Sequence, residues 1–473
     1  MVFSSILFIF IFLPLFLLGH SWVKSTQVRN WVILLFSILF YAWGAPKFVF
    51  VILGSTVLDF FIVRSIYRST ILKRKRLFLA SSLIMNLGLL AYFKYANFFV
   101  ENVNAALLGL GMESVTWTSV ALPIGISFYT FQTLTYSIDV YRGVHAPLKK
   151  VQDYLLYIMS FPQMIAGPIV RYNVIADQIE HRPLISDDFL MGFIRFAIGL
   201  AKKVIIANVM AQQADFIFDG DLSQLPTAAA WVGIIAYTFQ IYFDFSGYSD
   251  MAIGLGRMMG FTFPENFNSP YTSKSITEFW RKWHITLGGF MRDYLYIPLG
   301  GNKVGSTFRV YLNLITVFLL SGLWHGASWN FVIWGAFHGI FLILDRVGLA
   351  KVLQKCGTFV AVPFTFLVVM IGWVFFRLES FGDAVHYIGT MFQFQGGNFL
   401  VYENFKIMVW VAIIFAFFVL VPSGQRIESL VFEHHVYPKR KLILGWLVSM
   451  ILLALSVALI FSNSFNPFIY FRF

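Results

Sequence analysis

Long apolar runs recur along nearly the whole of this 473-residue chain. Stretches of about 17 to 25 predominantly apolar residues are long enough to cross the hydrocarbon core of a bilayer as helices. Charged residues make up only 12% of the sequence, against about 25% in soluble domains. Together these features exclude an ordinary soluble enzyme, a disordered protein and a nucleic-acid-binding domain. They predict an all-α polytopic membrane protein.

About twelve stretches fit membrane-spanning helices, and three of them are short or interrupted by polar residues, so about ten to twelve spans are expected. They are residues 2–19, 30–44, 47–63, 77–98, 120–140, 188–217, 227–248, 309–325, 329–346, 359–376, 405–422 and 442–462. We expect a single membrane domain over residues 1–473, because a chain embedded in lipid is better counted in spans than in soluble domains.

Basic residues between the spans predict the orientation of the chain. The cluster Arg64–Arg76 is strongly basic, and such clusters lie on the cytoplasmic side. Residues 101–118 carry two glutamates and no Lys or Arg, which suits an external loop. The next apolar segment, Tyr154–Val170, agrees with the charge pattern only if it enters the membrane and returns. Pro162 and Pro168 interrupt it, so we predict a re-entrant hairpin.

The segment Thr262–Arg309 is the least membrane-like part of the chain. Ser275 is followed three residues later by Glu278, as in a capping box, and Glu278 forms an i,i+4 pair with Lys282. The run from Glu278 to His284 is therefore predicted to start a helix at the cytoplasmic interface. That helix would place three rings on one face: Trp280, Trp283 and His284.

His325 lies between two apolar runs, within or close to the membrane. An ionisable group at that depth is a functional candidate, although a histidine hydrogen-bonded between helices can also be structural. Gly322 and Gly326 on either side would let backbone or substrate approach closely, and Trp324 can wall off a pocket. We therefore take His325 as the principal catalytic candidate.

His284 is the second catalytic candidate, because a neutral imidazole is a natural general base. The alternative for His284 is an interfacial residue that bonds a lipid or a loop carbonyl, and for His338 close helix packing is favoured. Asp244 and Asp250 end a span in a cluster of hydroxyls. They either wall a polar cavity or orient a histidine, or they satisfy backbone groups at a helix end. The full set of cavity candidates is Trp324, Asp244, Asp250, Trp280 and Arg281.

Several kinds of site are excluded by missing motifs. The sequence contains no HExxH, no CxxC and only one cysteine, Cys356, so we expect no metal site. It also contains no GxSxG and no GxxxxGK[ST], the marks of a serine hydrolase and a nucleotide site. The excess of 35 Lys and Arg over 23 Asp and Glu is assigned to cytoplasmic loops, not to nucleic acid. No bound cofactor is expected.

Six motifs make the chain resemble the membrane-bound O-acyltransferase family, in the branch of the bacterial alginate O-acetyltransferase membrane subunit. They are LPIGISFY from Leu122, FPQMIAGP from Phe161, YFDFSGYSDMAIG from Tyr242, SITEFWRKWH from Ser275, RDYLYIPLGGN from Arg292 and GLWHGA from Gly322. The resemblance is dense over residues 120–345, the expected catalytic core. It implies a ring of tilted transmembrane helices with re-entrant segments and cytoplasmic interfacial helices. In it His325 matches the family's essential histidine, held in a tunnel, and His284 the supporting one.

The resemblance also implies an activity. An acetyl group would move from a cytoplasmic thioester donor, acetyl-CoA or another acyl thioester, towards hydroxyls of an exported polysaccharide. The enzyme would be a multi-pass protein of the bacterial inner membrane, in contact with lipid, with a periplasmic partner resembling SGNH hydrolases.

Two alternatives stay open at this point. A related branch passes D-alanine from an acyl carrier protein to teichoic acid. A non-enzymatic alternative is a transporter or polysaccharide-export subunit, because broken helices also mark transport sites.

Overall fold

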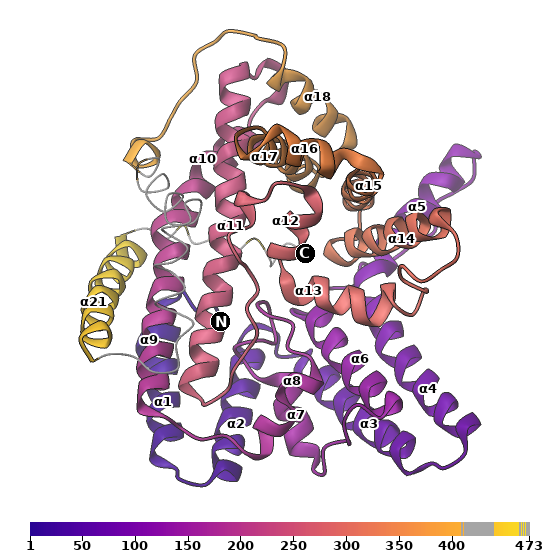
Figure 1. The fold of residues 1–473 in the computed structure, drawn as a ribbon, viewed down its shortest axis with the longest axis vertical. Coiled ribbons are helices and arrows are strands. Elements are labelled where there is room, and N and C mark those ends of the chain that lie inside the picture. Colours follow the sequence, from indigo (N-terminus) through magenta and orange to yellow (C-terminus); the bar gives the residue numbers. More distant parts are fainter. Residues whose placement is uncertain (408–409, 411–438, 463–464, 466, 468, 470–473) are drawn as a thin grey trace. The chain divides into compact units, whose positions relative to one another are not determined.

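The computed structural model describes residues 1–407, 410, 439–462, 465, 467 and 469. These residues form helices of very different lengths, connected by turns and irregular segments (Figure 1). Among them the only β-type pairing is an isolated antiparallel bridge between Phe267 and Trp283. The prediction of an all-helical membrane protein is confirmed.

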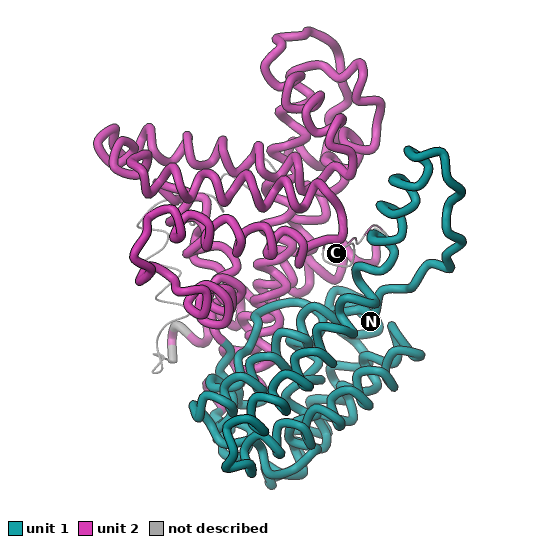
Figure 2. Tube along the Cα trace, turned by 90° about the vertical axis from the view of Figure 1, so that its right-hand side faces the viewer, with its two compact units in different colours: residues 1–185, 259–263 teal, residues 186–258, 264–473 magenta. Residues whose placement is uncertain are grey.

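The chain divides into two compact units (Figure 2). One comprises Met1–Ile185 and Met259–Phe263, and the other Ser186–Met258 and Pro264–Phe473. All the predicted site residues belong to the second unit. The single membrane domain expected from the sequence stays a prediction.

A buried carboxylate links several helices of the first unit. Asp59 accepts hydrogen bonds from the hydroxyls of Ser82 and Tyr154, at 2.5 and 2.6 Å, and from the Asn86 amide at 3.1 Å. The bonds connect α3, which carries Asp59, to α4 and α7. They also satisfy a carboxylate that would otherwise be costly to bury. The elements of this unit are η1 Phe8–Phe12, α1 Leu13–Trp22, α2 Thr26–Gly44, α3 Val49–Arg68, α4 Leu72–Leu90, η2 Ala91–Tyr95, α5 Ala96–Gly109, α6 Ile126–Arg142, α7 Val151–Met159 and α8 Tyr172–Glu180.

The segment predicted as a hairpin, Tyr154–Val170, does not form a spanning helix. It begins within α7, which has nine residues and rises only about 14 Å, less than half of the hydrocarbon core. Residues 160–170 are then irregular and buried. Their polar groups bond to protein, as when the Phe161 amide donates to the Ser37 hydroxyl at 3.0 Å. This is the environment in which non-helical backbone is tolerated at membrane depth.

The second unit is built around the 32-residue helix α11. Glycines let α9 lie directly against it: a Cβ added to Gly199 would lie 2.5 Å from the Gly247 carbonyl, and one on Gly254 2.5 Å from the Gly192 carbonyl. The opposite order of these contacts along the two helices makes the pair antiparallel. The elements of this unit are α9 Ser186–Ala201, η3 Lys202–Ala207, α10 Asn208–Phe218, η4 Leu222–Gln224, α11 Thr227–Met258, η5 Pro270–Thr272, α12 Ile276–Lys282, α13 Ile285–Phe290, η6 Met291–Tyr296, α14 Thr307–His325, α15 Trp329–Leu344, η7 Asp345–Leu349, α16 Ala350–Cys356, α17 Thr358–Arg377, α18 Phe381–Met391 and α21 Lys439–Ser462.

Seven helices of the described part are long and apolar enough to cross a membrane: Val49–Arg68, Leu72–Gly109, Thr227–Met258, Thr307–His325, Trp329–Cys356, Thr358–Arg377 and Leu442–Ser462. The other expected spans before residue 218 coincide with helices that are shorter or more polar. The expected span 405–422 lies largely outside the described residues. The chain is thus a multi-pass membrane protein, and the count of ten to twelve crossings stays a prediction.

Candidate active site

His325 is the last residue of α14, where that helix crosses α15 at very short distance. A Cβ added to Gly322 would overlap the Phe331 carbonyl, and one on Gly335 would overlap the Phe318 carbonyl. A Cβ added to Gly326, just after the helix, would overlap the Phe331 ring. The expectation that glycines beside His325 permit close approach is therefore confirmed, with the backbone and a ring of the same chain as the partners.

The imidazole of His325 lies in a box of aromatic rings. Its centroid is 4.9 Å from Trp324, 5.1 Å from Trp334 and 5.3 Å from Phe376, in edge-to-face arrangements. Only 4% of the residue is exposed. The imidazole is therefore packed against aromatic side chains of the same unit on several sides.

His284 does not continue a helix, so the expectation that α12 reaches it and aligns Trp280, Trp283 and His284 on one face is wrong. The capping box and the Glu278–Lys282 pair are present, but α12 ends at Lys282. The cause is tertiary: the Asn268 amide donates to the Lys282 carbonyl and the Ile285 amide to the Asn266 carbonyl, both at 2.9 Å. His284 is left in the left-handed region, at φ 47° and ψ 53°. This is uncommon for a residue other than glycine.

The side chain of His284 is fixed in one tautomer by Asn266. The Asn266 amide nitrogen donates to the Ser249 hydroxyl at 3.1 Å, so its carbonyl oxygen faces His284 and accepts from Nδ1 at 2.9 Å. The same oxygen accepts from the Thr286 hydroxyl at 2.8 Å. Nε2 is buried without a hydrogen-bond partner among the described residues. Burial lowers the pKa of the His284 imidazole to about 3, so Nε2 keeps its lone pair at neutral pH.

His284 and His325 both contact the indole ring of Trp324. Trp324 lies 6.1 Å from His284 and 4.9 Å from His325, measured between ring centroids. A second indole, Trp334, contacts both His325 and His338, each at 5.1 Å. His338 is fully buried, with its Nε2 only 2.6 Å from where a Cβ on Gly372 would stand, which fits the close packing expected of it.

Trp280 and Arg281, both on α12, have different surroundings. The Trp280 ring contacts His338 at 5.0 Å and Trp334 at 5.4 Å, so Trp280 belongs to the aromatic cluster behind His325. Arg281 is exposed.

Asp244 and Asp250 lie inside a helix, because α11 continues to Met258. The prediction that they stand at the end of a span is therefore wrong. Asp250 pairs with Arg195 at 2.9 Å and with Lys202 at 2.7 Å. Asp244 pairs with Lys203 at 2.7 Å. These bonds join α9 and η3 to α11. The carboxylates are thus engaged with cations, and their predicted place in a cavity wall is not observed in the cavity described next.

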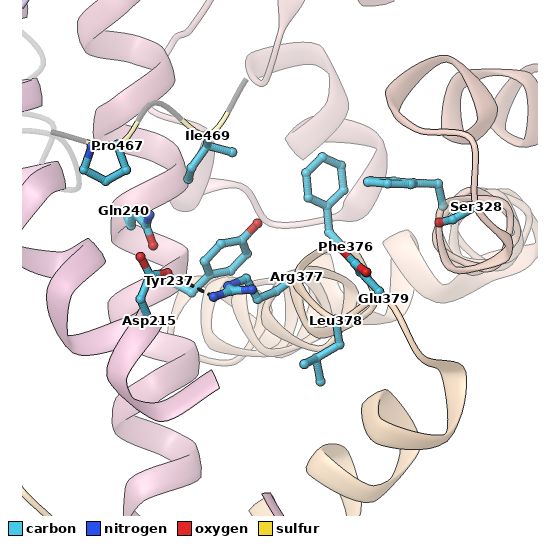
Figure 3. Close-up of a pocket in the computed structure, with 11 residues that line it drawn as sticks. Asp215, Tyr237, Gln240, Ser328, Phe376, Arg377, Leu378, Glu379, Pro467 and Ile469 are labelled. Atoms are coloured by element: carbon cyan, nitrogen blue, oxygen red, sulfur yellow. Dashed lines mark hydrogen bonds and ion pairs between the residues drawn. The ribbon is translucent and has the colours of Figure 1, made fainter. Parts of the chain in front are cut away.

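A cavity of about 100 Å³ lies in the second unit, close to the aromatic box. Phe376, which contacts His325, forms one side (Figure 3). Arg377 pairs with Asp215 at 3.0 Å on another side. The lining residues are Asp215, Tyr237, Gln240, Ser328, Phe331, Phe376, Arg377, Leu378, Glu379, Pro467 and Ile469.

Sequence reasoning did not identify Asn266, Phe376 or Gln240. They come from a loop, α17 and α11, far apart along the chain, and no local spacing links them to a histidine. In the described part of the chain, no three His, Cys, Asp or Glu side chains are grouped as metal ligands would be. The arrangement offers two buried imidazoles in contact with one indole, and a neutral imidazole can accept a proton from a hydroxyl.

Comparison with known proteins places this site in context. The model of the family MBOAT, membrane-bound O-acyltransferase family, matches residues 148–380, which include both candidate histidines. The chain is 47% identical to a probable alginate O-acetylase of Azotobacter vinelandii, over 83% of this chain and 78% of that protein. A probable alginate O-acetylase of Pseudomonas aeruginosa is 46% identical, over 83% and 75%. A peptidoglycan O-acetyltransferase of Helicobacter pylori is 38% identical, over 84% and 80%.

Proposed function

Because the chain belongs to the membrane-bound O-acyltransferase family, in the branch of the alginate O-acetyltransferases, we propose that it moves an acetyl group to hydroxyls of an exported polysaccharide. The donor is a thioester on the cytoplasmic side, acetyl-CoA or another acyl thioester. The membrane is the bacterial inner membrane. A periplasmic partner of the SGNH-hydrolase type is expected to complete the transfer.

In the proposed reaction His325 is the general base. The acceptor oxygen attacks the thioester carbonyl carbon, its proton passes to a ring nitrogen of His325, and the carbon–sulfur bond breaks. The proton then leaves with the thiolate as a thiol. A positioned base of this kind contributes about 10² to 10⁴ in rate, and holding both substrates in place supplies more.

The observation that carries the proposal is the contact of two buried histidines, His284 and His325, with the same indole, Trp324. His284 offers a lone pair at Nε2, which can bond a donor group or a water molecule in the site. We assign it a positioning role, since its own ring does not contact His325 among the ring contacts that define the box.

The alternatives are less well supported. D-alanyl transfer to a teichoic acid is disfavoured by the extent of similarity. The relatives named for O-acetyl transfer are 38–47% identical over 83–84% of this chain, whereas two teichoic acid D-alanyltransferases are 27–29% identical over 48–54% of it. A transport or export role would not require two buried histidines in contact with one indole. The transport role would be supported if the following experiment showed that acetylation does not depend on His325.

Replacing His325 by Ala tests the proposal. We expect His325→Ala to insert at normal abundance while ester-linked acetate on cell-surface polysaccharide falls at least 100-fold, in line with the loss of a general base. His386 provides the matched control, because it is exposed and its Nε2 bonds the Leu222 carbonyl of η4 at 3.1 Å. His386→Ala should retain normal acetate. Normal acetylation in His325→Ala would remove the catalytic assignment.

A further inference from the structure

We propose that residues 96–120 of the first unit, which we call the α5 arm, are a docking site for a protein of the external compartment that takes part in the acetyl transfer and whose contact surface is apolar and basic. The inference deepens the proposed function, on which its second test rests. The α5 arm consists of helix α5 and the irregular segment after it. Figure 2 shows them projecting from the rest of the first unit, and none of the residues of α5 is buried.

Counting residues along the helix places the α5 arm beyond the hydrocarbon core. The continuous helix Leu72–Gly109 has 38 residues and begins with the basic run 73–76, which is predicted to be cytoplasmic. About 20 residues cross the core, so a crossing that starts after this run is complete near Ala96. The part of α5 that follows contains three asparagines and a glutamate, namely Asn97, Glu101, Asn102 and Asn104. The α5 arm is therefore expected to enter the external aqueous phase.

The α5 arm exposes apolar side chains in that phase. Five of them, within ten residues of each other along the chain, are between 42% and 75% exposed: Leu108, Leu110, Met112, Val115 and Trp117. Lipid would cover such side chains inside the hydrocarbon core, but beyond the core they face water. Apolar side chains gathered in this way on an aqueous surface mark a site of interaction with another molecule.

Two asparagine side chains hold the segment after α5 in one conformation. Asn104 donates to the Val115 carbonyl at 3.1 Å and accepts from the Val115 amide at 2.7 Å. Asn97, about two helical turns earlier, bonds the carbonyl and the amide of Val120 in the same way, both at 2.9 Å. The Asn97 oxygen also accepts from the Trp117 indole at 3.0 Å. Trp117 is thus an exposed ring held in place, and such a ring loses little conformational freedom when a partner binds.

The charge of the α5 arm selects the occupant. Residues 96–120 carry two exposed glutamates, Glu101 and Glu113, and no Lys, Arg or His. Elements that lie on a membrane surface are rich in Lys and Arg, whereas these carboxylates would repel the phosphates of lipid headgroups. Contact between the arms of two copies would bring four carboxylates together without a cation from either arm. A protein with Lys and Arg beside an apolar patch complements both the charge and the exposed apolar side chains.

Photo-crosslinking in intact cells tests the proposal. Because Cys356 is the one cysteine of the sequence, a benzophenone can be attached at Leu110→Cys in the Cys356→Ser background. We expect an adduct with a protein of the external compartment, identified by mass spectrometry. Trp117→Ser should lower its yield about tenfold or more, and so should Glu113→Lys, which removes the charge complementarity. Trp43→Ser is the control, because Trp43 is 66% exposed and lies near the end of α2 in the same unit.

A second measurement relates docking to acetyl transfer. In Trp117→Ser, ester-linked acetate on cell-surface polysaccharide should fall about tenfold, while hydrolysis of an acetyl thioester by the purified chain in lipid nanodiscs stays at the wild-type rate. Misfolding would lower both, so this difference separates docking from a structural role.

Several results would overturn the proposal. They are an adduct with lipid or with a second copy of the chain, no protein adduct, an adduct that Trp117→Ser and Glu113→Lys leave unchanged, and normal acetate in Trp117→Ser. Failure of the proposed function gives a different result, in which His325→Ala keeps normal acetate while the adduct still depends on Trp117.

Discussion

At the scale of single residues, the imidazole of His284 depends on Asn266, a side chain 18 positions earlier in the chain. Asn266 accepts from Nδ1 and is itself oriented by Ser249, so the lone pair is confined to Nε2. Burial lowers the pKa of His284 to about 3. An amide is suited to this position because it orients the ring without adding charge.

Replacing that amide by a carboxylate should make the site sensitive to pH. In Asn266→Asp the new negative charge beside Nδ1 favours the imidazolium, so the pKa of His284 rises above about 3. As pH falls through the raised value, Nε2 gains a proton and its lone pair is lost. We therefore expect the ratio of variant to wild-type kcat to fall between pH 8 and pH 5. A ratio that does not change with pH would contradict the assigned role of Nε2.

At the scale of elements, the crossing of α14 and α15 determines where His325 stands. Gly322 and Gly335 bring the two backbones into contact, and no other residue fits at either position without displacing a helix. His325 follows Gly322 by less than one helical turn. A shift of this crossing therefore moves the imidazole relative to Phe376 on α17.

A methyl group at the crossing should destabilise the protein and disable it. We expect Gly335→Ala to lower the stability by about 1–3 kcal/mol, the usual cost of overpacking, as measured by the thermal unfolding temperature in detergent, and to reduce acetyl transfer. Gly54→Ala is the matched control, because nothing lies within 4 Å of a Cβ at that helical position. Alanine there should be neutral or stabilise the helix by up to about 1 kcal/mol. Equal stability of the two variants would refute the role of the crossing.

At the scale of the whole molecule, the basic loops predict the orientation of the chain in the membrane. The helix Leu72–Gly109 has 38 residues and begins in the basic cluster, so we expect it to cross once, with its C-terminal end on the external side. The short helix α7 and the buried irregular segment after it do not add a crossing as a helix. Asn173 should then lie in the cytoplasm.

Cysteine labelling tests this topology. The sequence has one cysteine, Cys356, so a Cys356→Ser background allows single reporters at Gly111 and at Asn173. An impermeant thiol reagent added to intact cells should label Gly111→Cys and spare Asn173→Cys, which reacts only after lysis. Labelling of Asn173→Cys from outside would refute the re-entrant hairpin.

The site could be predicted from the sequence only in part. His325 and His284 were identified because ionisable residues are conspicuous in apolar or aromatic sequence, and the capping box at Ser275 because it involves neighbours three residues apart. Asn266 and Gln240 carry no such mark. Their positions in the site result from contacts with residues far away along the chain, and a periodic sequence pattern cannot predict such contacts.

The sequence by itself determined that the chain is helical, that it crosses a membrane several times, and where most of its helices run. Apolar length, caps and charge in the loops are local properties, and the bilayer acts on each segment separately. Only the tertiary structure decided that α12 stops before His284, that Trp324 lies between the two histidines, and that a cavity opens behind Phe376. These features depend on which helices pack together, since backbone contacts between distant segments override the local preference of a short helix to continue.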